Sequence, residues 1–149
     1  MPITFRVAPA TKIIQTRATG IVNLQDLVRH LQVKERQRIL AYPEVFDTRG
    51  AQFDLSIIDI GRLVDEVRRA MSSTTPGPVA VVTNSNFIRG LARAYASLTI
   101  NDNPSFEIFD DVEEARSWIT RAATASTPGP LSESSQQKSS KAPPATSAP

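Results

Sequence analysis

The stretch that decides the fold is residues 44–63, which read EVFDTRGAQFDLSIIDIGRL. Val45 and Phe46 predict a short buried strand that ends in a turn at residues 47–50. Ser56 then begins a helix whose apolar residues recur with helical periodicity. A buried strand followed by an amphipathic helix is the repeating unit of α/β domains, so the flanking segments should show the same alternation.

Upstream of this stretch the pattern predicts a hairpin and a helix. Apolar and polar residues alternate over residues 3–7 and again over residues 12–20, with Pro9 between them, which predicts two antiparallel strands. Asn23 then precedes an apolar i, i+3, i+4, i+7 stripe, and Asp26 follows three residues after it. This spacing predicts a helix that begins with a capping box.

Immediately downstream the same signals recur. Asp59 follows Ser56 by three residues, as in the first helix, so the second helix should also begin with a cap and an acid. After Pro-Gly-Pro at residues 76–78, residues 79–83 read VAVVT. A nearly continuous apolar run of this kind is typical of a central parallel strand that is covered on both faces.

The remaining elements complete the alternation. Phe87, Leu91 and Tyr95 are spaced by four and predict the core-facing side of a third helix. Residues 106–109 predict a further strand, and Asp110 is expected to cap a final helix.

The predicted order is ββαβαβαβα, an α/β fold. Its sheet should be mixed but mostly parallel, begun by the antiparallel hairpin, connected by right-handed crossovers and covered by helices. Residues 1–123 are long enough to close one core. Residues 124–149 hold five of the eleven prolines, with Leu131 as the sole large aliphatic residue, and predict a disordered tail rich in Pro, Ser and Ala.

The composition of the chain bears on its binding partners and its cellular location. The 149 residues carry a formal charge of +2 without a basic region, which argues against a nucleic-acid partner. The chain has no cysteine, which suits a reducing compartment. Because no secretory signal and no apolar run of about 20 residues is evident, we expect a cytoplasmic protein without a transmembrane segment.

Four segments carry a family resemblance. They are residues 20–23 (GIVN), 47–50 (DTRG), 90–95 (GLARAY) and 109–119 (FDDVEEARSWI). In this order and spacing they resemble the SpoIIAA-like group of bacterial proteins, also described as STAS/SEC14-like, over about residues 3–122. The resemblance implies the fold predicted above and a role in binding or regulation, with lipid binding suggested by similarity to SEC14-type folds.

The resemblance also draws attention to Ser56. Anti-sigma-factor antagonists of the wider STAS class carry a phosphorylatable serine at this helix start, in a motif of Asp-Ser-Ser/Thr-Gly type. The corresponding segment here is Asp54-Leu55-Ser56-Ile57, which lacks the second hydroxyl residue and the glycine. A helix cap explains Ser56 fully, and the alternative is a regulatory switch phosphorylated at Ser56.

Common catalytic and cofactor motifs are missing. The single histidine, His30, falls on a polar helix flank, where we expect it to be solvated or partly packed. The sequence has no Gly-x-Ser-x-Gly turn, no phosphate-binding glycine loop and no histidine-carboxylate cluster with metal spacing. We therefore expect no enzyme activity, no metal and no cofactor.

Two charged clusters are explained by helix dipoles. Acidic pairs at residues 110–111 and 113–114 fall in the first turn of the last helix, where negative charge is favoured. Basic residues gather towards the end of the first helix, where cations are favoured: Arg29, Lys34, Arg36 and Arg38. We expect a solvated face there, and the alternative is a contact with phosphate or an anionic membrane.

The third helix begins differently from the others. Its start is uncharged but rich in donors, and it follows the most buried strand at the edge where open α/β sheets place ligands. The hypothesis is that an anionic headgroup of a lipid or metabolite is held by Asn84, Ser85, Asn86, Arg89 and Arg49. The alternative is that Asn84 or Ser85 only caps the helix and that the arginines are solvated.

The sequence therefore predicts a non-catalytic binding domain. Its partner would be a small anionic or lipid-like ligand or a protein, and a dimer of the chain is compatible with this fold. The alternative is a switch acting through Ser56, and an enzyme using Asp47 and Arg49 is the third candidate. The ligand hypothesis predicts an apolar cavity opening near Arg89, whereas the switch predicts an exposed Ser56 hydroxyl on a partner-sized surface.

Overall fold

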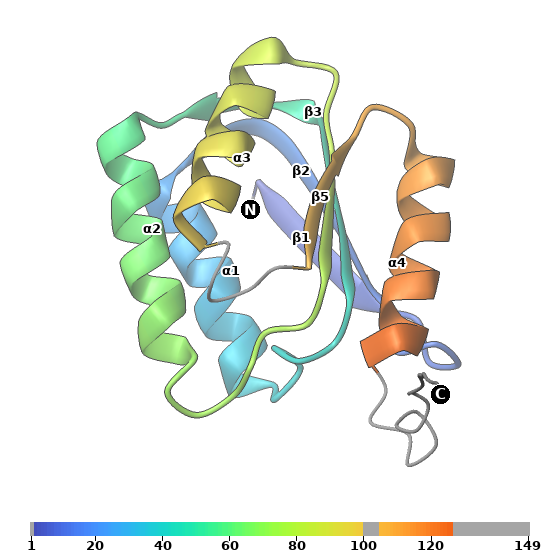
Figure 1. Cartoon of the computed structure of the whole chain (residues 1–149). Coiled ribbons are helices and arrows are strands. Elements are labelled where there is room, and N and C mark those ends of the chain that lie inside the picture. Colours follow the sequence, from blue (N-terminus) through green and yellow to red (C-terminus); the bar gives the residue numbers. More distant parts are fainter. Residues whose placement is uncertain (1, 100–104, 127–149) are drawn as a thin grey trace, which may run out of the picture.

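The computed structural model describes residues 2–99 and 105–126 and places five strands in one sheet, in the order β1-β2-β3-β4-β5 (Figure 1). The strands are β1 (Ile3–Val7), β2 (Ile14–Asn23), β3 (Glu44–Asp54), β4 (Val79–Val82) and β5 (Phe106–Phe109). The helices are α1 (Leu24–Arg36), α2 (Ile57–Ala70), α3 (Asn86–Thr99) and α4 (Val112–Ser126). β1 and β2 are antiparallel and the other pairs are parallel, so the predicted element order and mixed sheet are confirmed.

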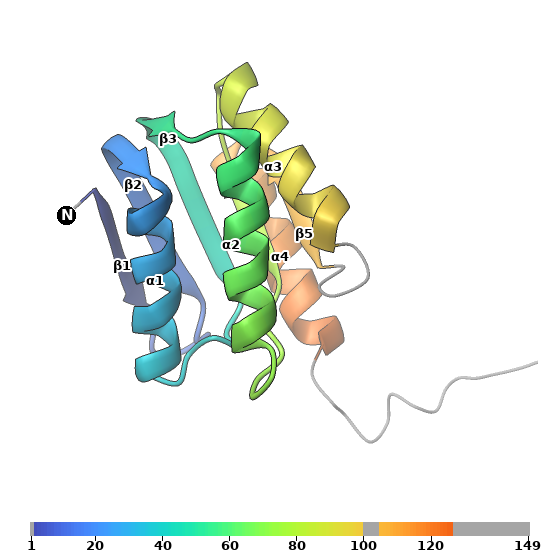
Figure 2. The same cartoon turned by 90° about the vertical axis from the view of Figure 1, so that its left-hand side faces the viewer.

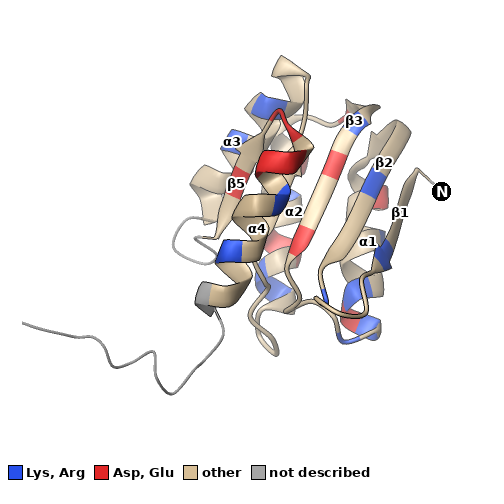
Figure 3. Ribbon diagram, turned by 90° about the vertical axis from the view of Figure 1, so that its right-hand side faces the viewer, with Lys and Arg blue, Asp and Glu red and all other residues tan. Residues whose placement is uncertain are grey.

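The strand order determines the layers. Because β2 to β5 follow one another across the sheet without reversal, the three crossover helices α1, α2 and α3 lie side by side on one face (Figures 1 and 2). α4 follows the last strand and packs on the opposite face, mainly over β3, β4 and β5. Figure 3 shows this opposite face of the sheet, with β1 and β2 beside α4.

Each face of the sheet has its own core. The larger one, under α1, α2 and α3, includes the buried residues Ala18, Val22, Leu27, Leu55, Ile60 and Leu91. The smaller one, under α4, is formed by Val45, Ala80, Val82, Ala115 and Ile119. Alternate residues of β4 thus serve opposite cores, which is why its run is continuously apolar.

The capping boxes of the first two helices are confirmed. In α1, Asn23 Oδ1 accepts from the Asp26 N–H at 3.0 Å, and Asp26 returns the contact to the Asn23 N–H at 3.0 Å. The last helix differs from the prediction. Asp111, not Asp110, is the cap, since its Oδ1 accepts from the Glu113 N–H at 3.1 Å and α4 begins at Val112.

The predicted turn at residues 47–50 is wrong. β3 continues through it to Asp54, paired in parallel with β2 across a register shift between Arg17 and Thr19. Gly50 eases the close approach of β2 and makes no turn, because a Cβ there would lie 3.3 Å from Thr19 Cγ2 and Thr19 would have to shift slightly.

The structure differs from the prediction in α3 and α4 as well. In α3 the buried apolar positions are Ile88 and Leu91, whereas Phe87 is 55% exposed, so the predicted core position of Phe87 is wrong. α4 extends to Ser126, so the first three residues of the predicted tail are helical. The rest of that tail, residues 127–149, lies outside the described residues.

A buried carboxylate joins α1 to the parallel pair β2 and β3. Glu44 is 2% exposed and accepts from Thr16 Oγ1 at 2.6 Å. His30 Nε2 lies 2.7 Å from one carboxylate oxygen, and Lys34 Nζ donates to the other at 2.5 Å. The polar flank predicted for His30 and the solvated face predicted for Lys34 are therefore wrong: both residues are buried, lie one helical turn apart and face the sheet.

The balance of charges keeps this carboxylate ionised. Burial by itself raises the pKa of Glu44, but the charge of Lys34, the imidazole of His30 and their hydrogen bonds outweigh burial and place the pKa well below its ordinary value of 4.5. The ionised cluster therefore stabilises the folded chain at neutral pH.

We predict that Glu44→Gln lowers the free energy of unfolding at pH 7 by about 3 kcal/mol, because three buried partners lose a charged acceptor. Since the pKa is lower in the folded than in the unfolded chain, the contribution of Glu44 is present above about pH 4.5 and is lost as the pH falls. The difference between the two proteins should then shrink, by at most about 1.4 kcal/mol per pH unit.

Urea unfolding between pH 7 and pH 3 measures this difference. Glu107→Gln is the matched control, because Glu107 is an exposed carboxylate on β5. Parallel pH profiles for wild type and Glu44→Gln would contradict the assigned charge.

Candidate functional site

The carboxyl ends of β2, β3 and β4 and the first turns of α2 and α3 lie at one edge of the molecule (Figures 1 and 2). Ser56 lies at this edge, is exposed, and caps α2. Its Oγ accepts from the Asp59 N–H at 3.2 Å, and Asp59 accepts from the Ser56 N–H at 3.0 Å. Ser56 is thus an exposed residue whose hydroxyl satisfies a helix N–H.

Large apolar side chains are exposed at this same edge. In the first turns of α2 and α3 they are Ile57, Ile58 and Phe87. We call these three residues the apolar surface. Ile21, near the end of β2, is also exposed, but its neighbour Val22 faces the core under the crossover helices, so Ile21 points to the opposite face of the sheet. Ile57 and Ile58 are 61% and 70% exposed and follow Ser56 directly. The apolar surface therefore borders the hydroxyl that the sequence singled out.

A sequence signal for this surface was present. Consecutive helical residues point about 100° apart, so the position of each isoleucine relative to the core-facing stripe can be read from the sequence. The core-facing stripe of α2 is Ile60, Val64 and Val67, which leaves Ile58 on another side of the helix. Ile57 belongs to the first turn and remains uncovered because of its place at the end of the helix.

Four of the predicted anion-site residues come together at the start of α3. Ser85 Oγ accepts from the Ile88 N–H at 3.2 Å, so Ser85 caps the helix. Asn84 and Asn86 are exposed beside it. Arg89 turns back towards the preceding loop, with Nη2 3.5 Å from the carbonyl oxygen of Thr83.

Arg49 does not join these residues. It lies within β3 rather than at its end, and it pairs with Asp47 through contacts of 3.0 Å from Nε and 2.8 Å from Nη2. Asp47 lines a groove beside α4, whereas Arg89 belongs to α3 on the other face. The hydrogen bond from Arg49, more than its charge, lowers the pKa of Asp47, so this pair is ionised at neutral pH.

An apolar cavity lies between the sheet and the three crossover helices. Its volume is about 140 Å³, and its walls include Ile88 and Leu91 of α3 and the Glu44 cluster. Arg89 does not line it. Drug-sized ligands occupy about 300–1,000 Å³, so this space matches a single small ring rather than a lipid chain.

Two other classes of site were searched within the described ranges. Residues 2–99 and 105–126 contain no group of three His, Asp or Glu side chains arranged to hold a metal ion. In the same part of the chain, no helix is both long and apolar enough to cross a membrane.

No protein-family model and no curated protein matches this chain. Two solved structures are similar in fold. An uncharacterized protein with a SpoIIAA-like fold from Shewanella loihica PV-4 is 14% identical, with a TM-score of 0.52 over 78% of this chain and 93% of that one. The anti-sigma factor antagonist SpoIIAA in its unphosphorylated form is 12% identical, with a TM-score of 0.51 over 80% of this chain and 97% of that one. The fold of the chain is therefore SpoIIAA-like, as the sequence resemblance implied.

We predict that Ser56→Ala lowers the free energy of unfolding by about 1 kcal/mol, because the Asp59 N–H loses its acceptor. Ser56→Asp should retain most of the stability, since aspartate is an equally good cap. Urea unfolding of both variants tests this. Ser72→Ala, a change of an exposed serine beyond the end of α2, is the control and should leave the stability unchanged. Equal stability of Ser56→Ala and wild type would show that the cap contributes nothing.

Proposed function

We propose that this SpoIIAA-like chain is a non-catalytic regulatory domain that binds a folded protein partner through the apolar surface beside Ser56. The observation that carries the proposal is the exposure of Ile57 and Ile58, at 61% and 70%, in the first turn of α2. Neighbouring exposed apolar side chains of this size are a feature of protein interaction sites.

Energetics favour a protein partner. Burying an isoleucine side chain is worth about 1.5–3 kcal/mol, so Ile57 and Ile58 alone supply a substantial part of a micromolar affinity. Phe87 extends the same surface to the start of α3. Because these side chains belong to regular elements, little conformational entropy is lost when a partner covers them.

The fold supports the same conclusion. SpoIIAA, which shares it, is named as an antagonist of an anti-sigma factor, a role that is exercised on another protein. At 12% identity the likeness carries the fold alone. The assignment of the apolar surface to partner binding therefore rests on the exposed isoleucines.

Phosphorylation of Ser56 is a second candidate, favoured by its exposure and by its position next to Ile57. A phosphoryl group there would gain from the positive end of α2 but would lie beside the Asp59 carboxylate. It would also place about two negative charges at the apolar surface. The expected result of phosphorylation is release of the partner.

The start of α3 supports a third candidate, the anion site formed by Asn84, Ser85, Asn86 and Arg89. In its favour, the first turn of α3 contains no acidic residue, unlike the other three helices. Sulfate titrated into the protein should shift the amide signals of these residues. Arg89→Glu should abolish the shifts and leave the fold intact, and shifts that persist in this variant would exclude the site.

The main proposal is tested with a photo-reactive amino acid placed at position 58 in cells of the source organism. The protein that is cross-linked is then purified, and its affinity for each variant is measured by calorimetry. We predict that the double variant Ile57→Ser, Ile58→Ser binds about 100-fold more weakly, since two buried isoleucines are lost.

Leu98→Ser is the matched control, because Leu98 is exposed and apolar but lies at the opposite end of α3. It should bind within twofold of wild type. A partner that binds the double variant as tightly as wild type would contradict the proposal. Equal losses from both variants would indicate a nonspecific effect and would also count against it.

A further inference from the structure

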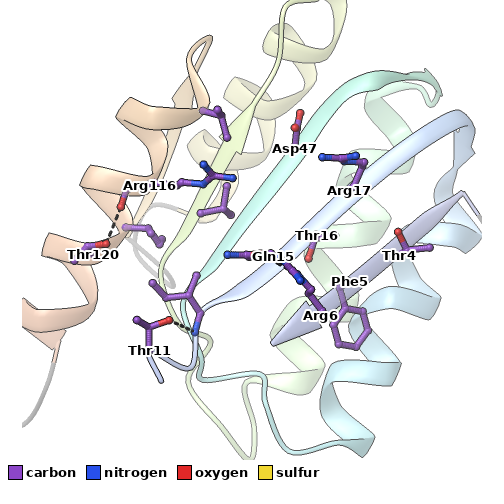
Figure 4. Close-up of a pocket in the computed structure, with 14 residues that line it drawn as sticks. Thr4, Phe5, Arg6, Thr11, Gln15, Thr16, Arg17, Asp47, Arg116 and Thr120 are labelled. Atoms are coloured by element: carbon purple, nitrogen blue, oxygen red, sulfur yellow. Dashed lines mark hydrogen bonds between the residues drawn. The ribbon is translucent and has the colours of Figure 1, made fainter. Parts of the chain in front are cut away.

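A groove runs between α4 and the β1–β2 hairpin, on the face of the sheet opposite the crossover helices (Figure 4). Its volume is about 610 Å³, within the range of small-molecule sites and more than four times that of the internal cavity. It exists because α4 packs mainly over β3, β4 and β5, which leaves the hairpin half of this face beside the helix.

The groove combines an apolar floor with cationic walls. The floor includes Val45 and Ile119, which are buried, and Val112. The walls carry three arginines from three different elements: Arg6 on β1, Arg17 on β2 and Arg116 on α4 (Figure 4). An apolar floor with a few convergent polar groups is the common composition of ligand sites.

The negative charge in the groove is already neutralised. Among the described residues that line the groove, Asp47 is the sole carboxylate, and both its oxygens accept from Arg49. The guanidinium of Arg17 makes no hydrogen bond or ion pair with a described residue, although its charge helps to lower the pKa of Asp47. Arg17 is thus a cation without a direct partner at the wall of a groove.

The other two arginines are only partly engaged. Arg6 donates from Nε to Gln15 Oε1 at 3.1 Å, so both of its Nη groups remain available. Arg116 donates from Nη1 to Glu113 Oε2 at 2.8 Å, but these side chains are 54% and 72% exposed, and such a surface pair is weak. A bound anion can therefore replace Glu113 at little cost.

We propose that this groove binds a small molecule that carries two anionic groups, carboxylate or phosphate, on a body with an apolar face. One group would be held from the sheet side by Arg17 and Arg6, and the other from the helix side by Arg116. Arginine suits this role because its planar donors match the oxygens of carboxylates and phosphates. The apolar body would lie on the floor beside Val45.

The groove and the proposed protein-binding surface are separate. The groove is lined by β1, β2, β3 and α4, whereas Ile57, Ile58 and Phe87 lie on α2 and α3, the helices of the other face of the sheet. Ligand binding in the groove therefore does not depend on partner binding at the apolar surface.

The test uses the ¹⁵N-labelled full chain, titrated with inorganic pyrophosphate and, separately, with succinate, at constant ionic strength. Saturable shifts are expected at the amides of Arg6, Arg17 and Arg116. Stronger binding of pyrophosphate assigns the groove to phosphate ligands, and stronger binding of succinate assigns it to dicarboxylates. Arg17→Gln and Arg116→Gln should each weaken binding about 10-fold or more, since each removes a charged hydrogen bond.

Arg93→Gln is the matched control, because Arg93 is an exposed arginine on α3, a helix of the other face. It makes the same change of charge and should leave the affinity within twofold. Equal weakening by all three variants would mean nonspecific charge attraction and would overturn the proposal. Shifts centred on residues 84–89, or no saturable binding of either probe, would also overturn it.

Discussion

The buried carboxylate of Glu44 is the constraint on which the rest of the structure depends. It begins β3 and accepts from Thr16 of β2 and from Lys34 of α1, while His30 of α1 lies against the same group. A charge placed here without these partners would be strongly destabilising, because the protein interior cannot solvate it. The three partners must therefore arrive together, which fixes the rotation of α1 about its axis and its place over β2 and β3.

This cluster explains why α1 is oriented as it is. Its apolar stripe alone would tolerate some rotation, but His30 and Lys34 reach Glu44 only when the same face is turned to the sheet. Replacing such a cluster by apolar residues is often neutral for stability, so its contribution is as much to a unique arrangement as to free energy. The cluster also forms part of the wall of the small internal cavity, which is therefore not uniformly apolar.

The strand order decides where function can be located. Ligand crevices of open α/β sheets form where the strand order reverses, and the order β1-β2-β3-β4-β5 has no such reversal. The strand order therefore gives no support to the predicted anion site at the end of β4, although the polar residues predicted for that site do gather around Ser85. What the order creates instead is an edge with exposed isoleucines on one side and, beside α4 on the opposite face, a groove with three arginines.

Local signals in the sequence determined the elements and their order. Asn23 with Asp26 and Ser56 with Asp59 fixed two helix starts, because a cap and its acid act within one turn and need no tertiary contact. The apolar run of β4 indicated a central strand, because burial on both faces leaves no room for polar residues.

Only the tertiary structure decided the roles of Gly50, His30 and Arg49. Gly50 lies where β2 approaches closely, and His30 lies against the charge of Glu44, so both depend on residues distant in sequence. The role of Arg49 depends on the alternation of β3, which turns its side chain to the face of α4. The pairings of Gly50 and His30 leave no periodic mark in the sequence, since their partners are distant along the chain and meet them only after the sheet has formed.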